Sequence, residues 1–173
     1  MMNNSPATIL LVDDDQFITI AYKQGLERHG YKVMTACDGE EALQQIATTT
    51  PDLVLLDLIL PKKDGFEVLQ CVKCDPNLAH IPVVVLSSLG QASDEKTAYD
   101  CGAVDFLVKS NVTLNGILLR IERLLEQTAG EVSADPQNPE PGATDGNGQN
   151  PAAANPESAE AGPQTDPDTR TSE

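Results

Sequence analysis

Five short aliphatic segments within the first 128 residues constrain the fold of this chain most strongly. Three of them are apolar at nearly every position, which is typical of strands buried on both faces of a parallel sheet. Each is bounded by polar residues, glycine or proline, so the sequence predicts five separate strands. The segments are TILLV (8–12), VMTA (33–36), DLVLL (52–56), PVVVLS (82–87) and VDFLV (104–108).

Helical patterns fill the intervals between these strands. The clearest is the last, whose apolar residues recur at helical spacing: Leu114, Ile117, Leu118, Ile121, Leu124 and Leu125. The weakest covers residues 92–101, where few apolar side chains precede Gly102. Strands that alternate with helices through right-handed crossovers predict an α/β fold, a doubly wound five-stranded parallel sheet with five helices.

The composition changes beyond residue 128. Residues 129–173 hold seven of the 12 prolines, no aromatic residue, and nine acidic side chains against one basic. So little apolar surface cannot offset roughly 1–2 kcal/mol of backbone ordering entropy per residue. The sequence therefore predicts a disordered N-terminus (1–6), a folded domain (7–128) and a disordered acidic tail (129–173). The tail is either a solvated appendage or an acidic interaction segment.

The net charge of −16 narrows the classes of partner. Direct binding of nucleic acid needs a cluster of basic side chains, and the largest basic cluster is Lys62-Lys63. We therefore expect no direct binding of nucleic acid.

The sequence contains no run of 18 apolar residues and no leader pattern, so we expect a cytoplasmic protein without membrane insertion. The pair Cys71 and Cys74 forms a lone C-x-x-C, and a zinc site is not expected there because Cys37 and Cys101 lie on other segments.

Polar side chains follow four of the predicted strands, at the point where each strand ends. Asp13 and Asp14 follow the first, Asp57 the third, Ser87 ends the fourth, and Lys109 follows the fifth. Because the carboxyl ends of parallel strands meet at one edge of a sheet, we expect these side chains to converge there.

Carboxylates brought together at that edge repel one another unless a cation compensates them. Hard oxygen ligands favour Mg²⁺, so Asp13, Asp14 and Asp57 form a candidate magnesium site. Asp57 is also a candidate nucleophile, because a carboxylate can attack phosphorus to give an acyl phosphate. Lys109 could neutralise the transferring group, and Ser87 could bond one of its oxygens.

These residues resemble the motifs of one known family. ILLVDDD, PDLVLLDLILPKKDGFEVL, IPVVVLSS and GAVDFLVKS are similar to the receiver domains of bacterial two-component response regulators, including the single-domain chemotaxis type. The resemblance covers about residues 7–127 and implies a flavodoxin-like strand order, 2-1-3-4-5. It implies that Asp57 is the phosphoacceptor and that Mg²⁺ is the cofactor.

The resemblance also implies roles for individual residues. Asp13, Asp14, Asp57 and the backbone carbonyl of Ile59 would bind Mg²⁺, Ser87 and Lys109 would sense the phosphoryl group, and Phe106 would act with Ser87 as a switch. Asp15 fits a helix N-cap better than a ligand. Ser110 departs from the family, which usually has proline after the lysine, so the Lys109–Ser110 peptide is either a costly cis bond or trans.

The predicted function is a stand-alone phosphoacceptor in a phosphorelay, not an enzyme with a separate substrate. A histidine kinase or phosphotransfer protein would donate the phosphoryl group to Asp57. An unidentified output protein, or a phosphorylation-dependent dimer, would contact the face formed by residues 92–101, 104–108 and the final helix. Two alternatives stay open: a pseudo-receiver that binds partners without phosphorylation, and a phosphatase with an aspartyl nucleophile.

Overall fold

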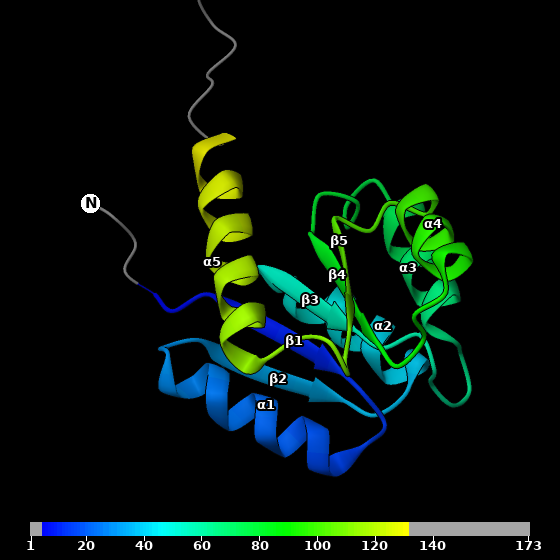
Figure 1. Cartoon of the computed structure of the whole chain (residues 1–173). Helices are drawn as coiled ribbons and strands as arrows, with labels where there is room; N and C mark the ends of the chain where they lie inside the picture. Colours follow the sequence, from blue (N-terminus) through cyan, green and yellow to red (C-terminus); the bar gives the residue numbers. More distant parts are fainter. Residues whose placement is uncertain (1–4, 132–173) are drawn as a thin grey trace, which may run out of the picture. The chain divides into compact units, whose positions relative to one another are not determined.

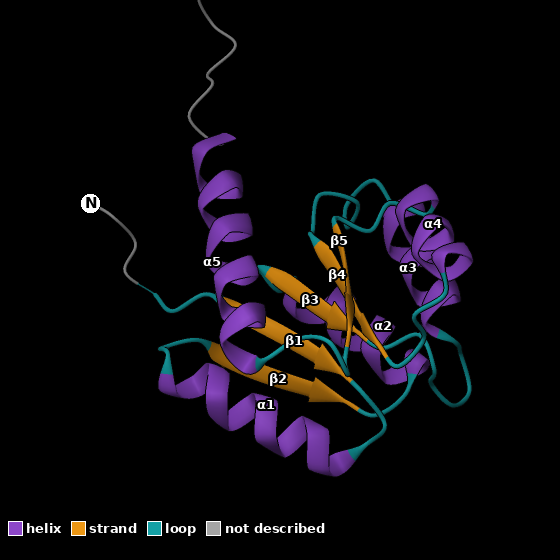
Figure 2. Cartoon of the chain, in the orientation of Figure 1, coloured by secondary structure: helices purple, strands orange, loops and turns teal. Residues whose placement is uncertain are grey.

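The structure is a computed structural model and describes residues 5–131. Strands and helices alternate strictly through this range, as Figures 1 and 2 show. The strands are β1 (Thr8–Val12), β2 (Lys32–Ala36), β3 (Leu53–Leu56), β4 (Val83–Ser87) and β5 (Asp105–Val108). The helices are α1 (Gln16–Arg28), α2 (Gly39–Thr49), α3 (Gly65–Cys74), α4 (Ala92–Asp100) and α5 (Leu114–Glu131). The predicted α/β fold is confirmed.

All five strands pair in parallel in the order β2-β1-β3-β4-β5, which is the predicted flavodoxin-like order. The register aligns Val12 of β1 with Leu56 of β3, and Ser87 of β4 with Val108 of β5. The residues that follow β1, β3, β4 and β5 therefore come to the same edge of the sheet.

Helices cover both faces of the sheet, so two apolar layers form. In Figure 1, α1 and α5 lie on one face, and α2, α3 and α4 lie on the other. Along β1, Leu10 and Val12 pack with the second group of helices, whereas Ile9 and Leu11 pack with the first. Burial of successive side chains on opposite faces explains why the strands are apolar at nearly every position.

The central strand β3 gives a direct test of this packing. Leu55 is 1% exposed and packs in the layer beneath α1 and α5. Replacement by alanine leaves a cavity there, so we expect Leu55→Ala to lower the free energy of unfolding by about 2–5 kcal/mol in urea titrations. Leu119→Ala is the control, because Leu119 on α5 is 67% exposed and its truncation should cost under about 0.5 kcal/mol. Equal losses in the two variants would contradict this packing.

Aspartates begin three of the helices. The side chains of Asp15, Asp38 and Asp64 each accept hydrogen bonds from backbone N–H groups in the first turn of α1, α2 and α3. Asp64 forms a reciprocal capping box with Glu67. By contrast, Gln91 at the N-cap of α4 makes no side-chain cap bond, and Ala98 is the one fully buried residue of that helix. The prediction that α4 is the weakest helix is consistent with these contacts.

Gly65 lets α3 begin directly against the end of β3. A Cβ atom at this position would lie 2.2 Å from the carbonyl oxygen of Asp57, which is too close for any other residue. The Gly65 N–H donates to the Leu58 carbonyl at 3.0 Å, so the loop folds back tightly. This glycine therefore helps to fix the backbone around Asp57.

Helix α5 continues to Glu131, past residue 128, where the sequence analysis placed the end of the domain. The predicted tail from residue 132 onward, and residues 1–4 of the predicted N-terminal segment, lie outside the described residues. Within residues 5–131, no helix combines the length and apolar character needed to cross a membrane.

Candidate functional site

The residues predicted at the strand ends converge on Asp57. Its Oδ1 accepts a hydrogen bond from the Ser87 hydroxyl at 2.8 Å and another from the Ile59 backbone N–H at 3.1 Å. Its Oδ2 bonds the Lys109 ammonium. Lys109 also bonds Asp13, with 2.6 Å between Nζ and Oδ2. Four side chains from β1, β3, β4 and β5 therefore form one connected polar cluster.

This cluster is buried, which strengthens its electrostatics. Asp13 is 3% exposed, Asp57 4% and Ser87 0%. Burial raises the pKa of Asp13, and the bond from Lys109 opposes that rise only in part. Burial would lower the pKa of Lys109, but its bonds to Asp13 and Asp57 raise it overall. One ammonium thus serves two carboxylates, and the site has an excess of negative charge.

Asp14 adds a third carboxylate at the exposed margin of the cluster. One carboxylate oxygen from each of Asp13, Asp14 and Asp57 lies within 4.8 Å of the others. Such a set of hard oxygen donors, partly open to water, fits Mg²⁺, which takes one or two carboxylates and retains several waters. A bound divalent cation would also offset the cost that burial places on the Asp13 carboxylate.

Asp15 turns away from this cluster. Its Oδ1 accepts from the backbone N–H groups of Phe17 at 2.8 Å and Ile18 at 3.3 Å, which identifies it as the N-cap of α1. The backbone N–H of Asp15 donates to Asp13 Oδ1 at 3.0 Å and helps to orient that carboxylate. The N-cap interpretation of Asp15 is therefore confirmed.

Three apolar residues near the cluster, Phe106, Ile59 and Leu89, lie in different environments. Phe106 is 8% exposed and packs in the layer beneath α2, α3 and α4. Ile59 exposes 51% of its surface, and its N–H contacts the Asp57 carboxylate. Leu89 is partly buried, and its N–H donates to the Ser87 hydroxyl at 3.3 Å. Neither Ile59 nor Leu89 offers a polar side chain to the cluster.

An ion pair beside the site was not predicted from the sequence. Lys62, in the loop after β3, bonds the largely buried Asp38 carboxylate at 2.6 Å. The bond from Lys62 lowers the pKa of Asp38, as does the N–H of Glu41. This contact ties the loop that carries Ile59 to the start of α2. No local pattern reveals it, because the partners are 24 residues apart and meet only in the folded chain.

The cysteines in the described part of the chain differ in their surroundings. Cys71 and Cys74 are exposed on α3, and no cluster of potential ligands includes them. Cys37 lies near Asp38 and Glu41, but local bonds already use these groups. Glu41 accepts from the N–H and the thiol of Cys37, and Asp38 bonds Lys62.

Comparison with known proteins gives a family match and several similar proteins. The response regulator receiver domain family matches residues 9–122. The chain is 41% identical over 120 residues to the DNA-binding dual master transcriptional regulator RpaA of Synechocystis, covering 69% of this chain and 49% of that protein. It is 38% identical over 120 residues to the alkaline phosphatase synthesis transcriptional regulatory protein PhoP of Bacillus subtilis, covering 66% and 49%. The chain thus spans about half the length of these two relatives.

Solved structures give the same result. A putative response regulator from Chloroflexus aurantiacus is 33% identical with a TM-score of 0.66, covering 70% of this chain and 98% of that one. A CheY-like receiver domain protein from Methanospirillum hungatei is 28% identical with a TM-score of 0.69, covering 73% and 99%. The match to the family extends over most of the described residues and includes every member of the polar cluster. The chain therefore belongs to the response regulator receiver domain family.

Proposed function

We propose that Asp57 accepts a phosphoryl group, with Mg²⁺ held by Asp13, Asp14, Asp57 and the backbone carbonyl of Ile59. One observation carries this proposal: the Asp57 carboxylate bonds both the Ser87 hydroxyl and the Lys109 ammonium, beside a second buried carboxylate. Phosphorylation and Mg²⁺ binding are typical of this family, whose members interact with histidine kinases or phosphotransfer proteins.

The residues of the cluster suit the transfer. An oxygen of Asp57 attacks the phosphorus of a phosphohistidine, the new O–P bond forms, and the N–P bond breaks with release of the imidazole. Lys109 places a positive charge beside the group in transfer, and the Ser87 hydroxyl donates a hydrogen bond to one of its oxygens. Bound Mg²⁺ would supply further positive charge at the phosphoryl oxygens. The domain acts on itself, and its chemistry is its own phosphorylation and dephosphorylation.

The output of the domain is proposed to be a protein contact through α4, β5 and α5. The α4 helix is weakly anchored, so a small change near Ser87 can shift it. Tyr99 on α4 and Leu119 on α5 are 43% and 67% exposed and are available to a partner or a second copy. Phe106 lies in β5, the strand of this face that leads directly to Lys109. RpaA is described as DNA-binding, whereas the acidic composition here favours protein partners.

Intact-mass analysis tests the proposal. The full chain is incubated with Mg²⁺ and acetyl phosphate, and in parallel with EDTA in place of the metal. We expect one added phosphoryl group, a gain of about 80 Da, in the Mg²⁺ sample and none with EDTA. Absence of any adduct with Mg²⁺, together with no spectral change on addition of beryllofluoride, would favour the pseudo-receiver alternative.

The apolar neighbours of Asp57 predict slow self-dephosphorylation. Neither Ile59 nor Leu89 can orient an attacking water by hydrogen bonding, so we expect the phosphoryl group to persist well beyond seconds. Ile59→Asn introduces a polar side chain at the exposed margin of the site and should shorten the lifetime roughly tenfold. Ile20→Asn, at a similarly exposed position on α1, should leave it unchanged. The measurement is the decay of the phosphorylated mass after removal of acetyl phosphate, and a wild-type lifetime of seconds would contradict the prediction.

A further inference from the structure

A pocket lies at the amino ends of the strands, on the side of the sheet opposite Asp57. It has a volume of about 500 Å³ and is lined by residues from the end of α3, the α3–β4 loop, the start of β5 and the last turns of α5. Pro82 and Val104 immediately precede β4 and β5, so they mark the amino ends of those strands. Asp57, Ser87 and Lys109 lie at the carboxyl ends, roughly 15 Å away at 3.3 Å per residue.

Lys73 supplies the charge of this pocket. Its ammonium donates to the backbone carbonyl of Ala79 at 2.9 Å and to that of Ile81 at 2.6 Å. No carboxylate among residues 5–128 lies within ion-pair distance of it, and burial lowers the pKa of Lys73 without any opposing charge among them. An ammonium has three donors, so one remains for a ligand. A half-buried cation paired only with neutral carbonyls is stabilised by an anion.

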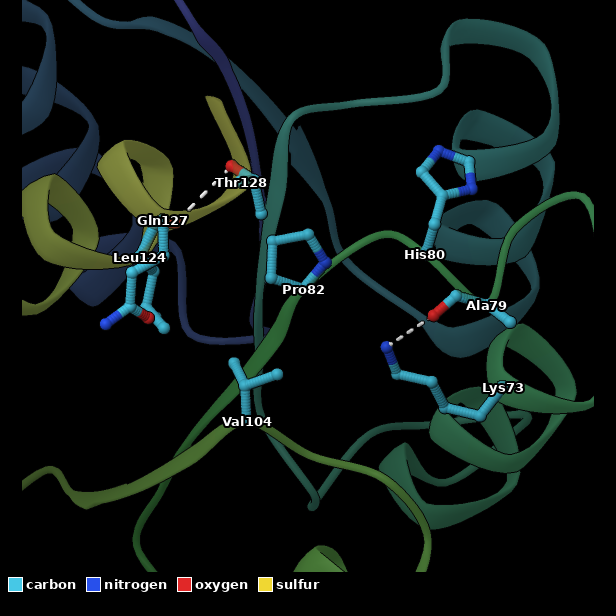
Figure 3. Close-up of a pocket in the computed structure, with 8 residues that line it drawn as sticks. All are labelled: Lys73, Ala79, His80, Pro82, Val104, Leu124, Gln127 and Thr128. Carbon is cyan, nitrogen blue, oxygen red and sulfur yellow. Dashed lines mark hydrogen bonds between the residues drawn. The ribbon is translucent and has the colours of Figure 1, made fainter. Parts of the chain in front are cut away.

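The rest of the lining limits the kind of anion. Figure 3 shows Lys73 on one side of the pocket, the side chains of α5 on the other, and Pro82 and Val104 between them. Pro82, Val104 and Leu124 make an apolar wall, and Gln127 contributes an exposed amide at the margin. The Thr128 hydroxyl already donates to the carbonyls of Leu124 and Leu125. In Figure 3 the His80 ring points away from the Lys73 ammonium.

We propose that this pocket binds a small organic monocarboxylate. The carboxylate accepts a hydrogen bond from the Lys73 ammonium, and a compact apolar body packs against Pro82, Val104 and Leu124. A phosphate dianion fits less well, because it would meet one cation and an apolar wall instead of a cluster of basic donors. Binding here requires no phosphorylation of Asp57, so this proposal is independent of the proposed function.

Benzoate and benzamide form a matched pair of probes, since they share the ring and differ in charge. Each is titrated into the full chain, and backbone amide shifts are followed by NMR. We expect benzoate to produce saturable shifts in the residues that line the pocket, with benzamide binding at least tenfold more weakly. Equal effects of the two probes, or no saturable benzoate shift up to about 20 mM, would overturn the proposal.

Matched variants distinguish an effect of charge at the pocket from an effect of the net charge of the chain. Lys73→Met removes the cation, and Gln127→Glu places a carboxylate at the pocket margin without disturbing the bonds that Lys73 makes to the loop. Both should weaken benzoate binding at least tenfold. Lys32→Met and Gln44→Glu make the same charge changes at exposed positions on β2 and α2, and should leave binding unchanged. Equal weakening by Gln44→Glu and Gln127→Glu would overturn the proposal even if Lys73→Met failed to fold.

Discussion

Asp57→Asn is expected to abolish phosphorylation by acetyl phosphate in the presence of Mg²⁺. The amide nitrogen and oxygen of asparagine are poor nucleophiles, whereas the carboxylate of Asp57 can form an acyl phosphate. The side chain keeps its size, and its amide oxygen can still accept the bond from Ser87, which is 2.8 Å from the carboxylate in the wild type. We therefore expect a folded variant without an adduct in intact-mass spectra.

A control variant tests whether the loss of any carboxylate would prevent phosphorylation. Asp100→Asn on α4 removes one exposed carboxylate, which pairs with Lys96 on the same helix. We expect Asp100→Asn to gain the phosphoryl mass at the wild-type rate. An adduct of equal extent in Asp57→Asn and the wild type would show that another residue accepts the phosphoryl group.

Lys109→Met should have two large effects. The side chain of Lys109 is 10% exposed, and its ammonium is the one that bonds both Asp13 and Asp57 in the described cluster. Loss of a positive charge aimed at the transferring group typically lowers a rate by about 10²–10³, so we expect phosphorylation to slow about a hundredfold. Two buried carboxylates are then left unpaired, and the free energy of unfolding without Mg²⁺ should fall by about 3 kcal/mol.

The dependence of this variant on Mg²⁺ gives a sharper test. A divalent cation at Asp13, Asp14 and Asp57 would replace part of the lost positive charge, so added Mg²⁺ should stabilise Lys109→Met more than the wild type. Denaturant titrations with and without Mg²⁺ measure this difference. Lys96→Met, at an exposed ion pair on α4, should change neither stability nor phosphorylation measurably. Wild-type phosphorylation rates in Lys109→Met would contradict the assigned role.

The strands and the polar residues at their ends could be predicted from the sequence, because strands buried on both faces are aliphatic at nearly every position. β3 and β4 read as nearly continuous aliphatic runs, and parallel pairing then brings Asp13, Asp57, Ser87 and Lys109 to one edge. The cap role of Asp15 was also predictable, because an aspartate directly before a helix has a well-defined bonding partner.

Contacts made by two lysine side chains could not be predicted in the same way. The bond between Lys62 and Asp38 joins residues 24 positions apart. The bonds from Lys73 to the Ala79 and Ile81 carbonyls depend on how the loop after α3 folds back against the end of that helix. A lysine in a polar loop or near the end of a helix is usually solvated, and its sequence neighbours do not show that its side chain is partly buried. The pocket at Lys73 is therefore a property of the tertiary structure.

Chemical mapping of the acceptor tests the central claim most directly. The chain is phosphorylated with acetyl phosphate and Mg²⁺ and then treated with borohydride, which reduces an aspartyl phosphate to homoserine. Peptide sequencing by mass spectrometry locates the converted residue. The proposed function predicts homoserine at position 57 alone, in the Mg²⁺ sample and not in the EDTA control. Conversion at Asp13, Asp14 or another residue, with Asp57 intact, would contradict it.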